Sequence, residues 1–140
     1  MKVLSRTVVL AVFAVLSLIT CKSFAQGSVT DVTLEGTIGK YPIVMELQVW
    51  EGGPNILGGN YYYKSQGPKN KIGVSSDLNI VEGNGYQPRL EETVKGKVTG
   101  VFYVSKWNMK TMSGTWIRTS DHKQFSFTLK VVKTYRHYYD

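Results

Sequence analysis

The residue types best suited to catalysis lie together in one short polar segment. Ser120, Asp121 and His122 are the three types of a hydrolase triad, but consecutive residues in one turn cannot align on one another as a triad requires. The only other histidine is His137, and the pair lacks the H-x-x-x-H spacing of a zinc site. We therefore interpret residues 120–122 as a turn.

Paired carboxylates are the second possible source of chemistry. Glu91 and Glu92 are adjacent, so in a strand their side chains would point to opposite faces. Glycoside hydrolysis instead needs two carboxylates facing each other across about 5–9.5 Å. There is also no glycine-rich phosphate loop leading into a helix. The sequence predicts no catalytic residues, no metal site and no cofactor, and favours a non-catalytic protein.

The first 25 residues have the pattern of a secretory signal peptide. Lys2 and Arg6 precede an apolar segment at 7–20, and Ser23 and Ala25 supply small residues at positions −3 and −1 of a cleavage site. The apolar segment is short for a membrane span, which needs about 20 residues. We expect a signal-peptide helix within residues 1–25 and an exported protein, either periplasmic or secreted.

The only cysteine, Cys21, lies within this segment. The alternative is a lipid anchor attached to Cys21, although Thr20 fits poorly at the position before a lipidated cysteine. Cleavage after Ala25 would leave residues 26–140 as one β-barrel domain without a disulfide. Attachment to a membrane is expected only if Cys21 is lipidated.

After removal of the signal peptide, the chain would be less positively charged than the full sequence. Removal of Lys2, Arg6 and Lys22 with the signal peptide would lower the formal charge from +7 to +4. This is weak support for an anionic ligand. Nucleic-acid binding is excluded, since it needs a concentrated basic face.

From residue 31 onward the hydrophobic residues alternate with polar ones, which indicates β-strands. Short Gly, Pro and Asn segments separate them and favour antiparallel neighbours. The sequence predicts an all-β, up-and-down meander of about eight strands that forms a closed or nearly closed small barrel, with an open coiled sheet as the alternative. The expected strands are 31–38, 41–50, 56–64, 71–80, 87–94, 97–105, 111–118 and 124–133.

A repeated apolar–x–Gly–x–aromatic pattern accounts for much of the aromatic content. It comprises Leu57/Gly59/Tyr61, Val98/Gly100/Phe102 and Met112/Gly114/Trp116, with Leu34/Gly36/Ile38 as a fourth version. At period two these residues share the inner face. The glycine leaves a slot that a neighbouring ring can fill, or a place where the backbone can bend for closure. We expect Tyr61, Phe102 and Trp116 to fill the core.

The same register places Tyr62, Tyr103 and Thr99 on the outer face. Clustered exposed aromatic residues often mark interfaces, and nearby basic residues would add stacking or cation–π contacts. The alternative is that loops or the C-terminal segment cover the rings. The predicted ligand- or partner-binding residues are Tyr62, Tyr103, Lys64, Lys106 and Arg118.

Five segments carry a resemblance to a known family: GKYPIVMEL (39–47), YYYKSQG (61–67), KVTGVF (97–102), SGTW (113–116) and FSFTL (125–129). The chain resembles a family of small, uncharacterised exported proteins of Gram-negative bacteria. This resemblance implies an extracytoplasmic all-β domain and does not indicate a reaction. The Gly-x-aromatic hairpins are also similar to those of avidin and lipocalin barrels (calycin-like), without matching ligand residues.

Two classes of function follow. The first is a non-catalytic binding module of the bacterial envelope that takes a sugar, a peptide or a small apolar or anionic molecule, at the barrel mouth or the outer face. The second is an interaction component or enzyme inhibitor in the periplasm, with an envelope protein as partner. An outer-membrane barrel is a remote alternative, since charged residues on a lipid-facing surface are costly.

Overall fold

The computed structural model describes residues 27–50, 55–76 and 88–139. The expected signal peptide and the expected strand residues 77–80 and 87 lie outside this part of the chain. Residues 29–137 form one compact unit. The described residues outside this unit are 27–28, at the start of the first strand, and 138–139, at the end of the last. The strands are β1 (Gly27–Ile38), β2 (Tyr41–Trp50), β3 (Ile56–Tyr63), β4 (Ile72–Ser76), β5 (Arg89–Val94), β6 (Lys97–Trp107), β7 (Thr111–Arg118) and β8 (Gln124–Tyr139).

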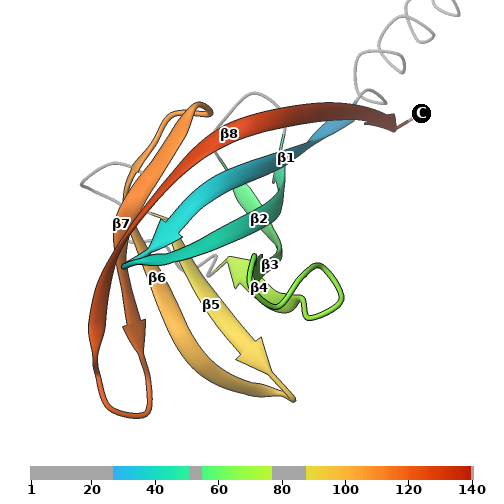
Figure 1. Ribbon diagram of the computed structural model, residues 1–140. Coiled ribbons are helices and arrows are strands. Elements are labelled where there is room, and N and C mark those ends of the chain that lie inside the picture. The colour runs from blue at the N-terminus through green and yellow to red at the C-terminus, as the bar shows by residue number, and fades with distance from the viewer. Residues whose placement is uncertain (1–26, 51–54, 77–87, 140) are drawn as a thin grey trace, which may run out of the picture. The chain divides into compact units, whose positions relative to one another are not determined.

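The strands form a closed barrel in their sequence order, β1 to β8 (Figure 1). Consecutive strands pair antiparallel. The first and last strands meet where the backbone N–H of Gly39 donates to the carbonyl oxygen of Ser126 over 2.7 Å. The predicted eight-stranded meander is confirmed, and the barrel is closed. In the described ranges no helix is long and apolar enough to span a membrane.

An up-and-down barrel collects alternate connections at the same end. The β1–β2, β3–β4, β5–β6 and β7–β8 connections therefore share one end, which we call the hairpin end. The β5–β6 turn consists of Lys95 and Gly96, both at positive φ (51° and 79°). Two successive positive φ values are typical of the tight hairpin turn that suits the twist of antiparallel strands.

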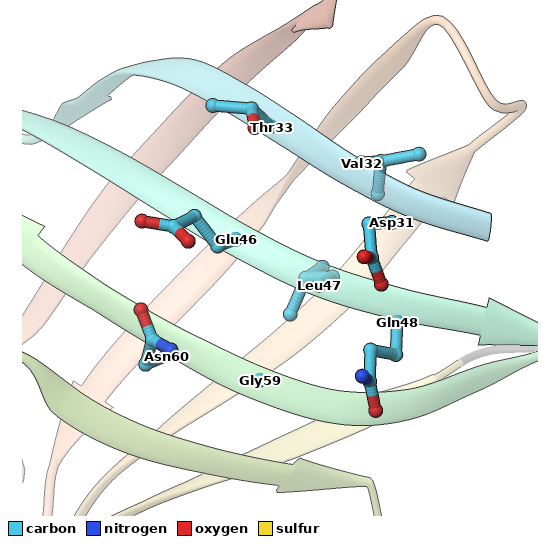
Figure 2. Close-up of a pocket in the computed structure, with 8 residues that line it drawn as sticks. All are labelled: Asp31, Val32, Thr33, Glu46, Leu47, Gln48, Gly59 and Asn60. Carbon is cyan, nitrogen blue, oxygen red and sulfur yellow. The ribbon is translucent and has the colours of Figure 1, made fainter. Parts of the chain in front are cut away.

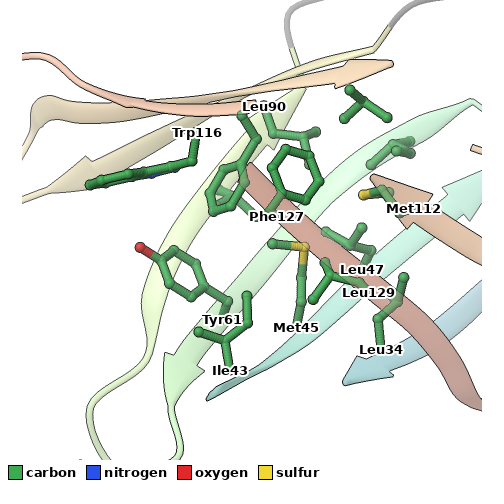
Figure 3. Packing of buried hydrophobic residues seen from close by; sticks show 14 of the residues in the cluster. Leu34, Ile43, Met45, Leu47, Tyr61, Leu90, Met112, Trp116, Phe127 and Leu129 are labelled. Atoms are coloured by element: carbon green, nitrogen blue, oxygen red, sulfur yellow. The ribbon is translucent and has the colours of Figure 1, made fainter. Parts of the chain in front are cut away.

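The barrel interior is filled by side chains (Figure 3). Tyr61 and Phe127 each pack edge-to-face on Phe102, with ring centroids 5.3 Å apart in both pairs. Trp116 and the hydroxyl of Tyr61 lie at one edge of this cluster. The expected burial of Tyr61, Phe102 and Trp116 is confirmed.

The repeated glycines play both of the expected roles: one leaves a slot for a neighbouring ring, and another allows close approach of the backbone. A Cβ on Gly100 would lie 2.6 Å from Nε1 of Trp116, so a neighbouring ring fills this slot. A Cβ on Gly59 would lie only 1.9 Å from the carbonyl oxygen of Glu46, so here the neighbouring backbone occupies the space. Close approach of two strands at a glycine is how a sheet bends sharply enough to close.

Three expectations about side-chain direction are wrong. Leu57 and Val98, expected on the inner face, are 43% and 42% exposed. Thr99, expected on the outer face, points inward. Glu92 pairs with Gly100 and Thr93 pairs with Val98, which leaves Thr99 as an extra residue in a β-bulge. The bulge turns the Thr99 side chain toward the barrel interior, where its hydroxyl donates to Glu92. Strict alternation placed Thr99 on the outer face because it does not allow for an inserted residue.

Candidate functional site

The most unusual group in the barrel is the carboxylate of Glu92 on the inner face of β5. The residue is only 6% exposed. Its Oε2 atom accepts hydrogen bonds from the Tyr61 hydroxyl and from Nε1 of Trp116, the latter over 3.1 Å. Its Oε1 atom accepts one from the hydroxyl of Thr99 over 2.6 Å. Buried carboxylates are costly without such partners, so three neutral donors hold this charge in place.

Local features of the strands bring these donors together. The bulge at Thr99 turns a hydroxyl inward that would otherwise face solvent. The absence of a side chain at Gly100 lets the Trp116 indole lie flat over β6, with its Nε1 toward Glu92. Tyr61 reaches the same carboxylate from β3. The network thus depends on a glycine, a bulge and two aromatic residues from separate strands.

An open pocket of about 310 Å³ lies at this network. Its lining combines the carboxylate, aromatic and aliphatic walls, and hydroxyl groups from the β7–β8 connection. The lining residues are Tyr61, Tyr63, Ile72, Glu92, Thr99, Trp116, Arg118, Thr119 and Ser120. A small number of polar groups in a concave, partly apolar site is the usual composition of a ligand pocket.

Burial favours the protonated form of two tyrosines at the pocket, Tyr61 and Tyr63, by raising the pKa of each. Burial, assisted by the Glu92 carboxylate, raises the pKa of Tyr61 far above its ordinary value of 10.0. Burial also raises the pKa of Tyr63, which packs edge-to-face on Tyr61 with centroids 5.7 Å apart. Tyr61 therefore stays a hydrogen-bond donor to Glu92 at every physiological pH.

This raised pKa predicts a loss of stability in alkali. Below about pH 10 Tyr61 is protonated in both folded and unfolded chains, so its contribution is constant. Above that pH the unfolded chain loses the proton and the folded chain keeps it. The free energy of unfolding then falls by up to about 1.4 kcal/mol per pH unit because of this residue. Urea unfolding between about pH 9 and 11.5 measures the slope.

Tyr61→Phe is the comparison, since phenylalanine cannot titrate. Its alkaline slope should be shallower than that of the unmodified protein by about 1 kcal/mol per pH unit. Its stability at neutral pH separately gives the contribution of the hydroxyl. Parallel slopes for the two proteins would show that Tyr61 titrates normally and is not held by Glu92.

Three cations at the hairpin end lie against aromatic rings beside the pocket. Lys40 lies 5.5 Å from the ring centroid of Tyr41, and Lys123 lies 5.6 Å from that of Phe125. Arg118 lies 5.9 Å from the centroid of the Trp116 ring. We call Lys40, Arg118 and Lys123 the cationic rim.

The β7–β8 connection holds Arg118 in place. Its Nη1 atom is 3.2 Å from Oδ2 of Asp121. The backbone N–H of Lys123 donates to the other oxygen of Asp121, and this bond, together with Arg118, lowers the pKa of that carboxyl. The residues of the triad-like segment therefore act as a turn, with Asp121 bonded to Arg118 and Lys123.

A second depression of about 340 Å³ lies on the outer wall of β1, β2 and β3 (Figure 2). Its two carboxylates each form an ion pair: Glu46 is 3.2 Å from Nζ of Lys71, and Asp31 is 2.5 Å from Nε2 of His137. The second oxygen of Asp31 and the amide oxygen of Asn60 are buried without a hydrogen-bond partner among the described residues. This outer-wall groove has no aromatic lining and no buried charge comparable to Glu92.

The sequence-predicted aromatic residues do not form one patch. Tyr62 on β3 is half-buried and Tyr103 on β6 is 42% exposed, and β4 and β5 lie between their strands. The registers also place Tyr62 next to the hairpin end, whereas Tyr103 pairs with Arg89 at the far end of β5. They lie on different parts of the barrel wall, and their binding role stays a prediction.

The three predicted basic residues are also separated. Lys64 forms an ion pair with Glu35 over 3.7 Å. Lys106 is exposed near the end of β6 that is remote from the hairpin end. Arg118 lines the pocket. Of the five predicted site residues, the structure therefore brings only Arg118 to the carboxylate pocket.

The residues that sequence reasoning missed are Glu92, Thr99 and Tyr63. Glu92 carried a usable signal, because it shares the inward register of Leu90 on β5, where a charged residue needs a partner. Its donors come from other strands, so their convergence is visible only in the folded barrel. In the described ranges no three His, Cys, Asp or Glu side chains form a cluster that could hold a metal ion.

Comparison with known proteins adds no function: no protein-family model, curated protein or solved structure matches the chain. The resemblance to small exported proteins stays a prediction.

Proposed function

We propose that this chain is a non-catalytic binding protein that takes a small polar ligand in the pocket at the hairpin end. The observation that carries the proposal is the buried carboxylate of Glu92, held by three neutral donors beside an open pocket. A charge that only stabilised the core would be better replaced by an apolar side chain. A charge kept at the foot of a pocket is suited to orienting a ligand.

The proposed setting is the bacterial envelope, as the expected signal peptide implies. Catalysis is not proposed, because Glu92 is the one carboxylate among the residues that line the pocket. Those residues include neither a histidine nor a second carboxylate to act with it as an acid–base pair.

The proposal is tested by NMR on the indole N–H groups of the protein. The chain has three tryptophans, of which Trp116 donates to Glu92, while Trp50 and Trp107 end β2 and β6 away from the hairpin end. Trp116→Phe assigns the reporter signal. A set of sugars, amino acids, short peptides, nucleosides and carboxylic acids is added one by one. We expect at least one class to shift the Trp116 signal and leave the other two in place.

Glu92→Gln is the matched variant. Its amide oxygen can still accept from Tyr61 and Trp116, and its amide nitrogen can donate to the Thr99 hydroxyl, so we expect it to fold. Loss of a charge-assisted hydrogen bond should weaken binding by about tenfold or more. A screen in which no compound moves the Trp116 signal, or in which the hits bind Glu92→Gln equally well, would refute the proposed site.

A second candidate function is docking of a protein partner on the outer wall at Tyr103. Its ring is 42% exposed, and the guanidinium of Arg89 lies 5.4 Å from its centroid. Tyrosine and arginine are common among the residues that dominate protein interfaces. Tyr103→Ala should leave the Trp116 signal and its ligand response unchanged, so it separates the two sites.

A further inference from the structure

We propose that the ligand of the hairpin-end pocket is a small zwitterion, with an ammonium group at Glu92 and an anionic group at the cationic rim. This inference rests on the proposed function, because it specifies the ligand of the same site. The inference is based on two opposite charges at different depths: the carboxylate of Glu92 inside the pocket and the cationic rim beside it.

The deeper charge is negative. A carboxylate offers about four acceptor positions, and the described donors to Glu92 are Tyr61, Trp116 and Thr99. All three donors are neutral, and no described Lys or Arg side chain forms an ion pair with Glu92. The remaining acceptor position therefore suits a donor from the ligand. A cationic donor gains most there, since charges attract more strongly where water is excluded.

The outer charge is positive. Lys40 lies against Tyr41, whose ring packs on Tyr63 of the pocket wall with centroids 6.3 Å apart. Lys123 lies against Phe125, which packs on Trp116 of the pocket wall with centroids 5.9 Å apart. Each of these two ammonium groups is thus separated from a residue of the pocket wall by one aromatic ring.

The other residues of the four hairpin connections strengthen this field. Besides the rim, the connections and the strand residues next to them contain Lys64, Lys69, Lys71, Lys95 and Lys97. Two of these lysines form ion pairs: Lys64 with Glu35 of β1, and Lys71 with Glu46 of β2. The single acidic residue in these four connections is Asp121. A concentration of one sign of charge around a cleft raises the local concentration of ligands of the opposite sign.

The size and walls of the pocket limit the ligand further. A volume of about 310 Å³ is at the small end of the range for ligand sites, which favours a small molecule. Ile72, Tyr63 and Trp116 add apolar and aromatic contact to the pocket lining. A molecule of dipeptide size, with a ring or aliphatic group between its two charges, fits these constraints.

Isothermal titration calorimetry with three matched probes tests the inference. Alanyl-phenylalanine carries both charges, its N-acetyl derivative lacks the ammonium group, and its C-terminal amide lacks the carboxylate. We expect the free dipeptide to bind at least about tenfold more tightly than either blocked form, as loss of a charge-assisted contact implies. Added salt should weaken its binding through the exposed rim.

Two variants separate the two charges. Glu92→Gln should bind the free dipeptide no more tightly than the N-acetyl form. The double variant Lys40→Gln/Lys123→Gln should bind the free dipeptide no more tightly than the amide. Lys110→Gln/Lys130→Gln removes the same charge away from the hairpin end, at the start of the β7–β8 ladder, and should bind like the unmodified protein.

The results can overturn the zwitterion inference without overturning the proposed function. Equal binding of the free and N-acetyl forms overturns the ammonium contact at Glu92, and equal binding of the free and amide forms overturns the rim contact. Absence of binding by the free dipeptide at about 10 mM, far weaker than typical small-ligand affinities, overturns the inference as a whole. In each case the proposed function stands if another compound still shifts the Trp116 signal.

Discussion

Gly59→Ala should destabilise the barrel by about 3 kcal/mol or more, or prevent folding altogether. The added Cβ would lie 1.9 Å from the carbonyl oxygen of Glu46 and 2.9 Å from Cα of Leu47, and both atoms belong to backbone. A flexible side chain could move aside, but a paired strand can only separate. The loss should appear as a lower midpoint in urea unfolding or as insoluble protein.

Gly73→Ala is the control, since Gly73 lies on the neighbouring strand β4 and pairs with Asn60 beside Gly59. The nearest atom to an added Cβ there is the carbonyl oxygen of Thr93, at 3.9 Å. We expect a change within about 0.5 kcal/mol, as for an ordinary surface substitution. Equal losses at Gly59 and Gly73 would show that close backbone approach does not explain the glycine pattern.

Glu92→Ala should cost about 2–4 kcal/mol of unfolding free energy. The change removes the acceptor of the Tyr61 hydroxyl and of Nε1 of Trp116, and a buried donor without a partner costs about 1–3 kcal/mol. Thermal and urea unfolding, followed by tryptophan fluorescence, measure the loss.

Glu92→Gln should cost only about 1 kcal/mol, because it exchanges charge-assisted hydrogen bonds for neutral ones and keeps an acceptor for the Tyr61 hydroxyl and for Nε1 of Trp116. The difference between the two variants isolates the acceptor role of residue 92. If alanine and glutamine have the same effect, the three hydrogen bonds do not hold the carboxylate as the structure describes.

Much of the fold follows from local rules. The alternation in 41–50 and 111–118 predicts β2 and β7 with their observed ends, because each strand has one buried face and short turns on both sides. The Gly-x-aromatic pattern predicts which rings fill the core, since a shared face follows directly from period two. The full lengths of β1 and β8 are harder to predict from the sequence. Alternation weakens in the residues by which each strand is longer than expected, at the start of β1 and the end of β8.

The site could be predicted only in part. Arg118 was expected from its position near aromatic residues, and it lines the pocket. Strict alternation predicts Thr99 on the outer face, but a bulge shifts the register by one residue and turns it inward. No residue type in Val98–Gly100 signals where that insertion falls. That Tyr62 and Tyr103 lie apart could not be predicted for a different reason: alternation gives the face of a strand but not its neighbours around a barrel.

The central claim is that the carboxylate of Glu92 contacts the ligand. A structure of the protein bound to the tightest hit from the Trp116 screen tests it most directly. We predict a ligand in the hairpin-end pocket, with a donor atom within about 3 Å of the Glu92 carboxylate. A ligand seated in the outer-wall groove between Asp31 and Asn60, or beside Tyr103, with Glu92 still contacted by protein donors alone, would contradict it.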